Sequence, residues 1–149
     1  MPTKDAETDS AGFSADERAA MKQRAAELRA EGKKGAKKAD GLEQLLEAIE
    51  AMTPDDRELA ERVHVTVTEN APGLLPKTWY GMPAYANEDG KVVLFFQNSG
   101  KFNYSYSTLG FQDTAHLDDG DMWPIAYALT KWTPTVEKRV AELVRTAVS

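Results

Sequence analysis

Cysteine is absent from this 149-residue chain, and several classes of protein are excluded with it. Disulfide bonds, zinc–thiolate sites, iron–sulfur clusters and thiol catalysis all require cysteine. Long apolar runs are also missing. No stretch approaches the roughly 18 residues that span a bilayer, and no apolar segment typical of a secretory signal stands near the N-terminus. We therefore expect a cytoplasmic protein without a membrane partner.

Familiar catalytic and nucleotide-binding motifs are lacking too. The sequence contains no Gly-x-Ser-x-Gly elbow, no Walker A loop, no Gly-x-Gly-x-x-Gly and no His-Glu-x-x-His. A catalytic triad would have to use His64 or His116, the two histidines of the chain. The net charge of −6 argues against nucleic acid as a partner, because such proteins usually present a positive field.

What is present fits a globular domain with an added helix in front. Hydrophobic residues make up 42% and charged residues 28% of the chain, which is ordinary globular usage. Ser14 followed by Glu17 is a capping-box pattern, and the Ala-, Glu- and Lys-rich stretch after it predicts a helix over 15–31. Its apolar stripe is thin, so this helix must dock elsewhere or fray.

The regions flanking that helix are polar. Residues 1–12 show no periodic apolar positions and indicate a disordered tail. The Lys-rich residues 33–38 favour a solvated linker, with a contact to nucleic acid or to an acidic partner as the alternative. We predict an accessory region over residues 1–40 and a single domain over residues 41–149.

Three helices are expected within that domain. Leucines and other apolar residues recur at helical spacing after Asp40, with glutamates between them. Thr-Pro pairs at 53–54 and 133–134 are typical helix starts, with threonine as the N-cap and proline in the first turn. The helix after the first pair should end around Asn70, because proline and glycine follow it.

Between these helices the pattern predicts strands. Residues 77–86 suggest an edge or bulged strand, because Pro83 cannot donate to a neighbour. Residues 92–97 are apolar on both faces and predict a central strand covered on both sides. Residues 102–107 alternate as a strand does, and residues 123–129 predict a further extended segment. Short connections then give an antiparallel meander packed with helices, an α+β fold.

Several motifs resemble the YdhG-like domain family. They are Trp-Tyr-Gly-Met-Pro-Ala-Tyr at 79–85, Gly-Lys-Val-Val at 90–93, Lys-Phe at 101–102, Thr-Leu-Gly-Phe at 108–111, Ala-His-Leu-Asp-Asp-Gly at 115–120 and Met-Trp-Pro at 122–124. The resemblance covers roughly Leu42 to the C-terminus. It implies a compact α+β domain. One branch of the family is described as frataxin-like intracellular iron chaperones, and most members have no assigned activity.

Aromatic residues form the first candidate site. Large side chains in and near the Tyr-Gly-Met-Pro motif could stack a ligand, or they could fill the core between sheet and helices. The candidate ligand-binding residues are Trp79, Tyr80, Met82, Tyr104 and Tyr106.

An acidic segment forms the second candidate site. His116, Asp118 and Asp119 offer imidazole and carboxylate ligands that suit a divalent metal such as weakly bound iron. The spacing does not fit a calcium-binding EF-hand loop, and a solvated turn hinged at Gly120 explains the same residues.

Two functions remain open from the sequence. The first is a non-catalytic binding protein, and the resemblance adds iron binding or delivery to an iron-accepting protein. A second copy of the chain is the alternative partner, on which the helix over 15–31 would dock. The second is a small-molecule-binding or enzymatic domain that uses a cleft beside the aromatic face of the sheet.

Overall fold

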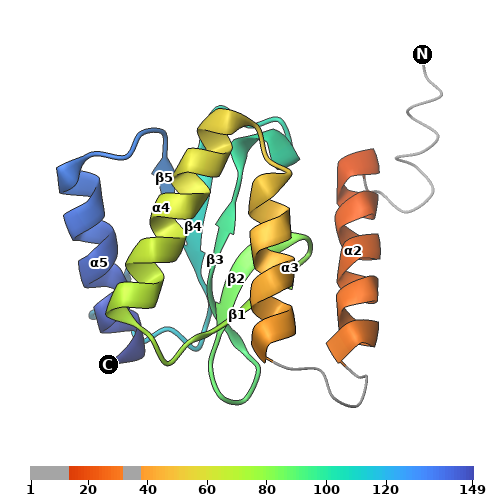
Figure 1. The fold of residues 1–149 in the computed structure, drawn as a ribbon. Coiled ribbons are helices and arrows are strands. Elements are labelled where there is room, and N and C mark those ends of the chain that lie inside the picture. The colour runs from red at the N-terminus through yellow and green to blue at the C-terminus, as the bar shows by residue number, and fades with distance from the viewer. Residues whose placement is uncertain (1–13, 32–37) are drawn as a thin grey trace.

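The computed structural model describes residues 14–31 and 38–149. Within them, one sheet and four α-helices form an α+β fold with an extra helix in front, as the sequence predicts (Figure 1). The helices are α2 (Ala15–Glu31), α3 (Lys38–Glu50), α4 (Pro54–Asn70) and α5 (Pro134–Val148). The strands are β1 (Leu75–Trp79), β2 (Met82–Ala86), β3 (Val92–Gln97), β4 (Ser107–Phe111) and β5 (Ala126–Leu129), with the short 3₁₀ helix η1 (Ser99–Lys101) after β3. The tail predicted for residues 1–12 and residues 33–37 of the predicted linker 33–38 lie outside the described residues, whereas Lys38 begins α3.

Each strand pairs with the next one in the chain. The sheet order is β1-β2-β3-β4-β5, and all four pairings are antiparallel. This is the predicted meander, since hairpin-length connections join antiparallel neighbours. The predicted extended segment at 123–129 is shorter in the structure, where β5 begins at Ala126.

Local sequence signals explain where the helices begin. In the capping box before α2, the backbone N–H of Glu17 donates to Ser14 Oγ at 3.1 Å, and the Ser14 N–H donates to Glu17 Oε1 at 2.9 Å. The hydroxyl of Thr133 accepts from the Val136 N–H at 3.2 Å and caps α5. Thr53 occupies the N-cap position of α4 without a side-chain bond to that helix's N–H groups.

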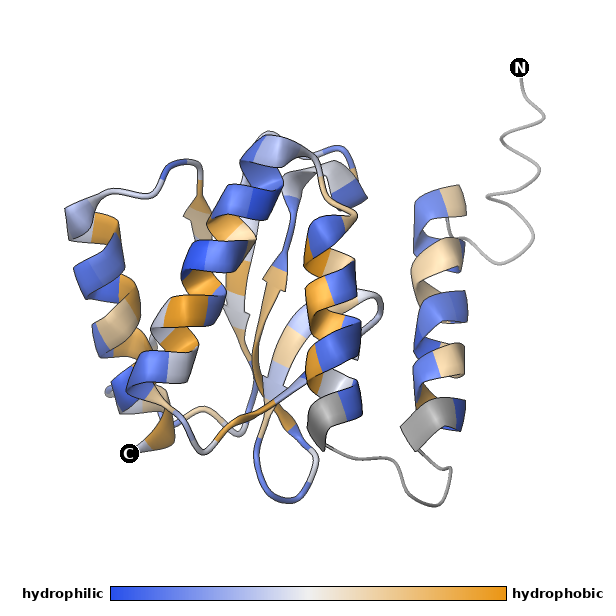
Figure 2. Ribbon diagram, viewed as in Figure 1, coloured by the Kyte–Doolittle hydropathy of each residue, from blue (hydrophilic) through white to orange (hydrophobic). Residues whose placement is uncertain are grey.

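Three helices cover one face of the sheet (Figure 1). Their apolar stripes turn toward the strands, while the blue, hydrophilic faces turn outward (Figure 2). Each helix contributes fully buried side chains to one continuous core with the strands. Examples are Leu45, Val63, Val144, Phe96 and Leu109. Most stability of such short helices comes from this packing rather than from helix propensity.

The segment predicted as one edge or bulged strand is two strands. Residues 77–86 contain the end of β1, a two-residue turn at Tyr80–Gly81 and all of β2. Both turn residues have positive φ, 55° and 79°, which is the geometry of a tight hairpin whose twist matches its strands. Pro83 is tolerated inside β2 opposite Thr78, and the expected irregularity occurs at the register shift between Tyr85 and Ala86.

The predicted strand at 102–107 is wrong. Only Ser107 of that segment is in a strand, and β4 runs on to Phe111. The preceding residues form a loop that is closed by two hydrogen bonds. The Ser99 N–H donates to Ser107 Oγ at 3.0 Å, and the Tyr104 N–H donates to Ser99 O at 2.8 Å. Asn103 has a φ of 62°, which breaks an extended run.

The two faces of β3 are buried to different degrees. Leu94 and Phe96 are fully buried in the core beneath the helices. Phe95 points to the opposite face and is only partly buried, against Gly110 and the Trp79 ring. The face of β3 beneath the helices is therefore fully buried at Leu94 and Phe96, whereas Phe95 on the other face is only partly buried.

Candidate binding surfaces

The aromatic candidates fall into two groups. Trp79 packs edge-on against Tyr80 at 5.1 Å between ring centroids and lies 5.3 Å from Phe95. Met82 is buried beside them. This first group therefore lines the face of the sheet that the three helices leave open.

Tyr104 and Tyr106 belong to the second group, on the loop between η1 and β4. Their rings lie 5.5 Å apart, and Phe102 lies 6.5 Å from Tyr104. Tyr104 is 50% and Tyr106 is 39% exposed, so these rings are not filling the core. The predicted ligand-binding residues thus include both partly buried packing residues and a solvent-facing aromatic row.

A carboxylate sits at the tip of the β1–β2 hairpin. Glu27 of α2 is buried, with only 9% of its surface exposed. Its Oε1 accepts from the Tyr80 N–H at 2.9 Å, and its Oε2 accepts from the Gly81 N–H at 2.8 Å. Sequence reasoning missed this contact, because the partners are more than 50 residues apart and α2 shows little apolar periodicity.

Basic groups surround the same tip. Arg24 lies 3.4 Å from Glu27 and 6.0 Å from the Tyr80 ring centroid. Lys101 donates from Nζ to Gln23 Oε1 at 3.1 Å. Burial lowers the pKa of Lys101, while the negative charges of Glu27 and Asp16 act in the opposite direction. The hairpin tip is therefore a polar junction between α2, the turn and η1.

Asp56 joins the start of α4 to the loop at η1. It is 5% exposed and accepts from Ser99 Oγ at 2.8 Å, from the Gly100 N–H at 3.0 Å and from Asn98 Nδ2 at 3.3 Å. Burial opposes its ionisation, but these hydrogen bonds outweigh burial and hold the pKa of the Asp56 carboxyl below its usual value. Asp56 also lies in the first turn of α4, where the helix dipole favours a negative charge, so it has two roles.

His64 and Tyr85 form a partly buried pair between α4 and β2. His64 Nδ1 lies 2.9 Å from the Tyr85 hydroxyl, and the two rings stack at 5.9 Å. Burial lowers the pKa of His64 and raises the pKa of Tyr85 far above its usual range. Both groups are therefore neutral near pH 7, which fits a structural pair that links α4 to the sheet.

The acidic segment lies beside the C-terminal end of α5. His116 Nδ1 lies 2.8 Å from the Ser149 carbonyl oxygen, and the His116 N–H donates to Ala147 O at 2.9 Å. Asp118 and Asp119 are exposed. Across residues 14–31 and 38–149, no three histidine or carboxylate side chains converge closely enough to hold a metal ion.

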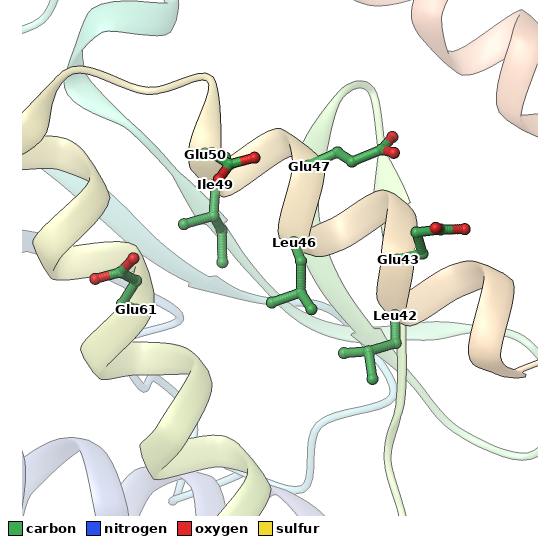
Figure 3. A pocket seen from close by; sticks show the side chains of 7 residues that line it. All are labelled: Leu42, Glu43, Leu46, Glu47, Ile49, Glu50 and Glu61. Carbon is green, nitrogen blue, oxygen red and sulfur yellow. The ribbon is translucent and has the colours of Figure 1, made fainter.

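A groove of about 500 Å³ runs between α3 and α4 (Figure 3). Leu42, Leu46 and Ile49 project from the side of α3 that faces α4. Ile49 is buried at 3% exposure, whereas Leu46 is 46% exposed. The remaining lining residues are all glutamates: Glu43, Glu47, Glu50 and Glu61. The groove combines apolar side chains with carboxylates of one charge sign, although Glu43 and Glu47 extend from the side of α3 that is turned away from α4 (Figure 3).

Comparison with known proteins adds no family or relative. No protein-family model, no curated protein and no solved structure matches the chain. The likeness to YdhG-like domains therefore stays a prediction from the motifs. In the described part of the chain, no helix combines the length and apolar character needed to cross a bilayer.

Proposed function

We propose that this protein is a non-catalytic binding protein and that the α3–α4 groove receives a basic amphipathic segment of a partner. The observation that carries the proposal is the half-exposed Leu46 among four glutamates. Within the described residues none of these carboxylates takes part in an ion pair. An apolar side chain of the partner would pack on Leu46, and flanking lysine or arginine residues would pair with the glutamates.

The negative charge of the groove favours a cationic ligand over an anionic or a neutral one. A volume of about 500 Å³ lies within the range of small-molecule pockets, roughly 300–1,000 Å³. Exposed glutamate walls repel anionic ligands and leave a neutral apolar ligand partly in water. A cationic amphipathic helix gains apolar burial on one face and electrostatic attraction on its flanks, the usual mode of helix-in-groove recognition.

The groove proposal is tested with an 18-residue Lys/Leu amphipathic peptide and its Glu/Leu counterpart, titrated into the full chain by calorimetry at two salt concentrations. We expect the basic peptide to bind and to weaken as salt rises, and the acidic peptide not to bind. Leu46→Ser should lower the affinity about tenfold or more, since it removes the exposed apolar contact.

Val65→Ser is the matched control, because Val65 is 51% exposed on α4 and does not line the groove. It should leave peptide affinity unchanged. Equal loss of affinity in the two variants, or equal binding of the two peptides, would remove the groove from the function.

Iron delivery, which the resemblance to YdhG-like proteins implies, stays a separate proposal. It rests on the exposure of Asp118 and Asp119 and on the availability of oxygen and imidazole ligands, which bind ferrous iron exchangeably. In anaerobic calorimetric titration with ferrous iron, the double variant Asp118→Asn/Asp119→Asn should bind more weakly than the wild type. Asp89→Asn, which changes an exposed aspartate of the β2–β3 turn, is the control. Unchanged affinity in the double variant would remove this segment from iron binding.

The alternative, a small-molecule or enzymatic site beside the aromatic face of the sheet, keeps its support from Trp79 and Phe95 on the open face. Its other members, Tyr104 and Tyr106, lie on the η1–β4 loop.

A further inference from the structure

The turn at the tip of the β1–β2 hairpin binds the carboxylate of Glu27 through its backbone N–H groups. Each oxygen of Glu27 accepts a hydrogen bond from one of two consecutive backbone N–H groups, at 2.9 and 2.8 Å. The donors belong to Tyr80 and Gly81, which both have positive φ. Successive N–H groups in turns of this kind can point into one concavity and bind anions.

The sequence of the turn is unusual for a purely structural hairpin. Turns with two positive φ values normally carry Asn-Gly or Asp-Gly, because these residues adopt the left-handed region at low cost. Tyr80 is a bulky residue at φ 55°, a genuine outlier. Such strain clusters at ligand-binding sites, where the surrounding structure maintains it.

Positive groups complete the site around the carboxylate. Arg24 contacts Glu27 at 3.4 Å. Lys101 lies close enough for the charge of Glu27 to act on it, and its Nζ bonds to Gln23 one helical turn before Glu27. Two N–H donors and two cations are more than a turn needs for its own hydrogen bonding.

The helix that supplies Glu27 is otherwise weakly attached. Among the α2 side chains that the structure describes, only Ala20 and Glu27 are buried, and its larger apolar residues Met21 and Leu28 are 45% and 52% exposed. Apolar burial therefore contributes little to the docking of α2, and the carboxylate is its main anchor.

We propose that the Tyr80–Gly81 turn is a carboxylate-binding site, that Glu27 is its internal occupant, and that an external carboxylate entering the site releases α2. The internal carboxylate competes at a high effective concentration, so an external one binds the wild type poorly. Removing the Glu27 carboxylate opens the site to ligands of the same chemistry.

The test follows the backbone amide signals of Tyr80 and Gly81 by NMR in the full chain during titration with sodium acetate, against sodium chloride at equal ionic strength. In Glu27→Ala, acetate should shift both signals saturably. In the wild type the same shift should need at least tenfold more acetate. Glu58→Ala, which removes an exposed glutamate of α4, should behave as the wild type.

Glu27→Gln is the second variant and keeps the side-chain volume. Its amide places an NH₂ donor against the turn, so it should also admit acetate. The proposal is overturned when neither Glu27 variant gives a saturable shift at these two amides while its other signals show a folded chain. Equal acetate affinity in wild type and variants also overturns it.

A peptide of residues 14–31 distinguishes the source of the carboxylate. Binding to the Glu27→Ala chain at least tenfold tighter than acetate, seen at the same two amides, supports a helix-borne glutamate as the ligand. Binding no tighter than acetate supports a small carboxylate instead. Peptide shifts confined to other residues contradict the site.

Discussion

Asp56 stabilises the fold through three hydrogen bonds to one loop. A hydrogen bond to a charged group contributes roughly 1.5–3 kcal/mol, and bonds that share one acceptor contribute less than their sum. We expect Asp56→Ala to lower the free energy of unfolding by about 2–4 kcal/mol, measured by urea denaturation. Asp55→Ala removes the exposed neighbouring carboxylate and should cost about 0.3–1 kcal/mol through the helix dipole alone. Similar losses in both variants would contradict the role of Asp56.

The same carboxylate makes stability depend on acid. The folded pKa of Asp56 lies below the unfolded value, so the unfolded chain binds more protons and stability rises with pH. This contribution is present above the unfolded pKa, 3.8, and is lost as the pH falls through the folded value. Unfolding free energies measured from pH 5 down to pH 2 should fall less steeply in Asp56→Asn than in wild type. Parallel curves would exclude this linkage.

His64 predicts a second pH dependence, at higher pH. Burial lowers the folded pKa of His64 below its usual 6.5, so protonation favours the unfolded chain. Stability should therefore fall as the pH drops below 6.5 toward the folded pKa. His64→Gln should remove this part of the dependence, as measured by thermal unfolding between pH 7.5 and 5. A wild-type slope that persists in His64→Gln would contradict this linkage.

For individual side chains, the sequence indicates the residue type but not the residues that each one contacts. Glu27 and Asp56 looked like ordinary helical carboxylates, because each contacts backbone that lies more than 40 residues away along the chain. Their roles depend on how α2 and α4 approach the loops. The exposed positions of Asp118 and Asp119, by contrast, agree with the solvated turn that was the alternative to a metal site.

Among the strands, the contact between Phe95 of β3 and Gly110 of β4 can be tested directly by substitution. A Cβ added to Gly110 would overlap with carbons of the Phe95 ring. We expect Gly110→Ala to destabilise the protein by about 1–3 kcal/mol through overpacking. Phe95→Ala/Gly110→Ala should lose less than the sum of the two single variants, because shrinking the ring makes room for the methyl group. Additive losses would contradict direct contact.

Phe96→Ala is the companion substitution on the core face. The ring is fully buried, so its loss should cost about 3–5 kcal/mol in denaturant unfolding. Phe95→Ala should cost less, because the ring is only partly buried. A larger loss for Phe95 would mean that the open face carries more of the stability than its burial indicates.

Element prediction succeeded where the pattern was local. Periodic apolar residues and Thr-Pro starts placed α4 and α5 closely, and the class of fold followed from them. It failed at residues 102–107, where strict alternation resembles a strand. There the Ser107 hydroxyl and the Tyr104 N–H bond to the backbone of Ser99, and Asp56 in turn holds Ser99 and Gly100. A local pattern does not contain the contact with Asp56.

The whole molecule presents two surfaces that should bind ligands of opposite charge. The α3–α4 groove carries uncompensated glutamates, whereas the hairpin tip offers N–H groups, Arg24 and Lys101 to a carboxylate. One surface should therefore bind cations and the other anions. Salt weakens exposed electrostatic contacts at both surfaces. Among the residues that the structure describes, only the hairpin tip has an occupant from the chain itself.

The last prediction concerns whether α2 belongs to the core. Deleting residues 1–37 should leave a cooperative thermal transition and an unchanged near-UV circular dichroism signal, because α2 buries little apolar surface. The deletion stops before Lys38, since α3 starts there and Gly41 packs closely on the Pro76 carbonyl. Deleting residues 1–13 alone is the control, which keeps α2 in place. The longer deletion should cost about 1–3 kcal/mol more, the value of the hydrogen bonds to Glu27. Loss of the near-UV signal would place α2 within the folding unit and move the domain boundary to its start.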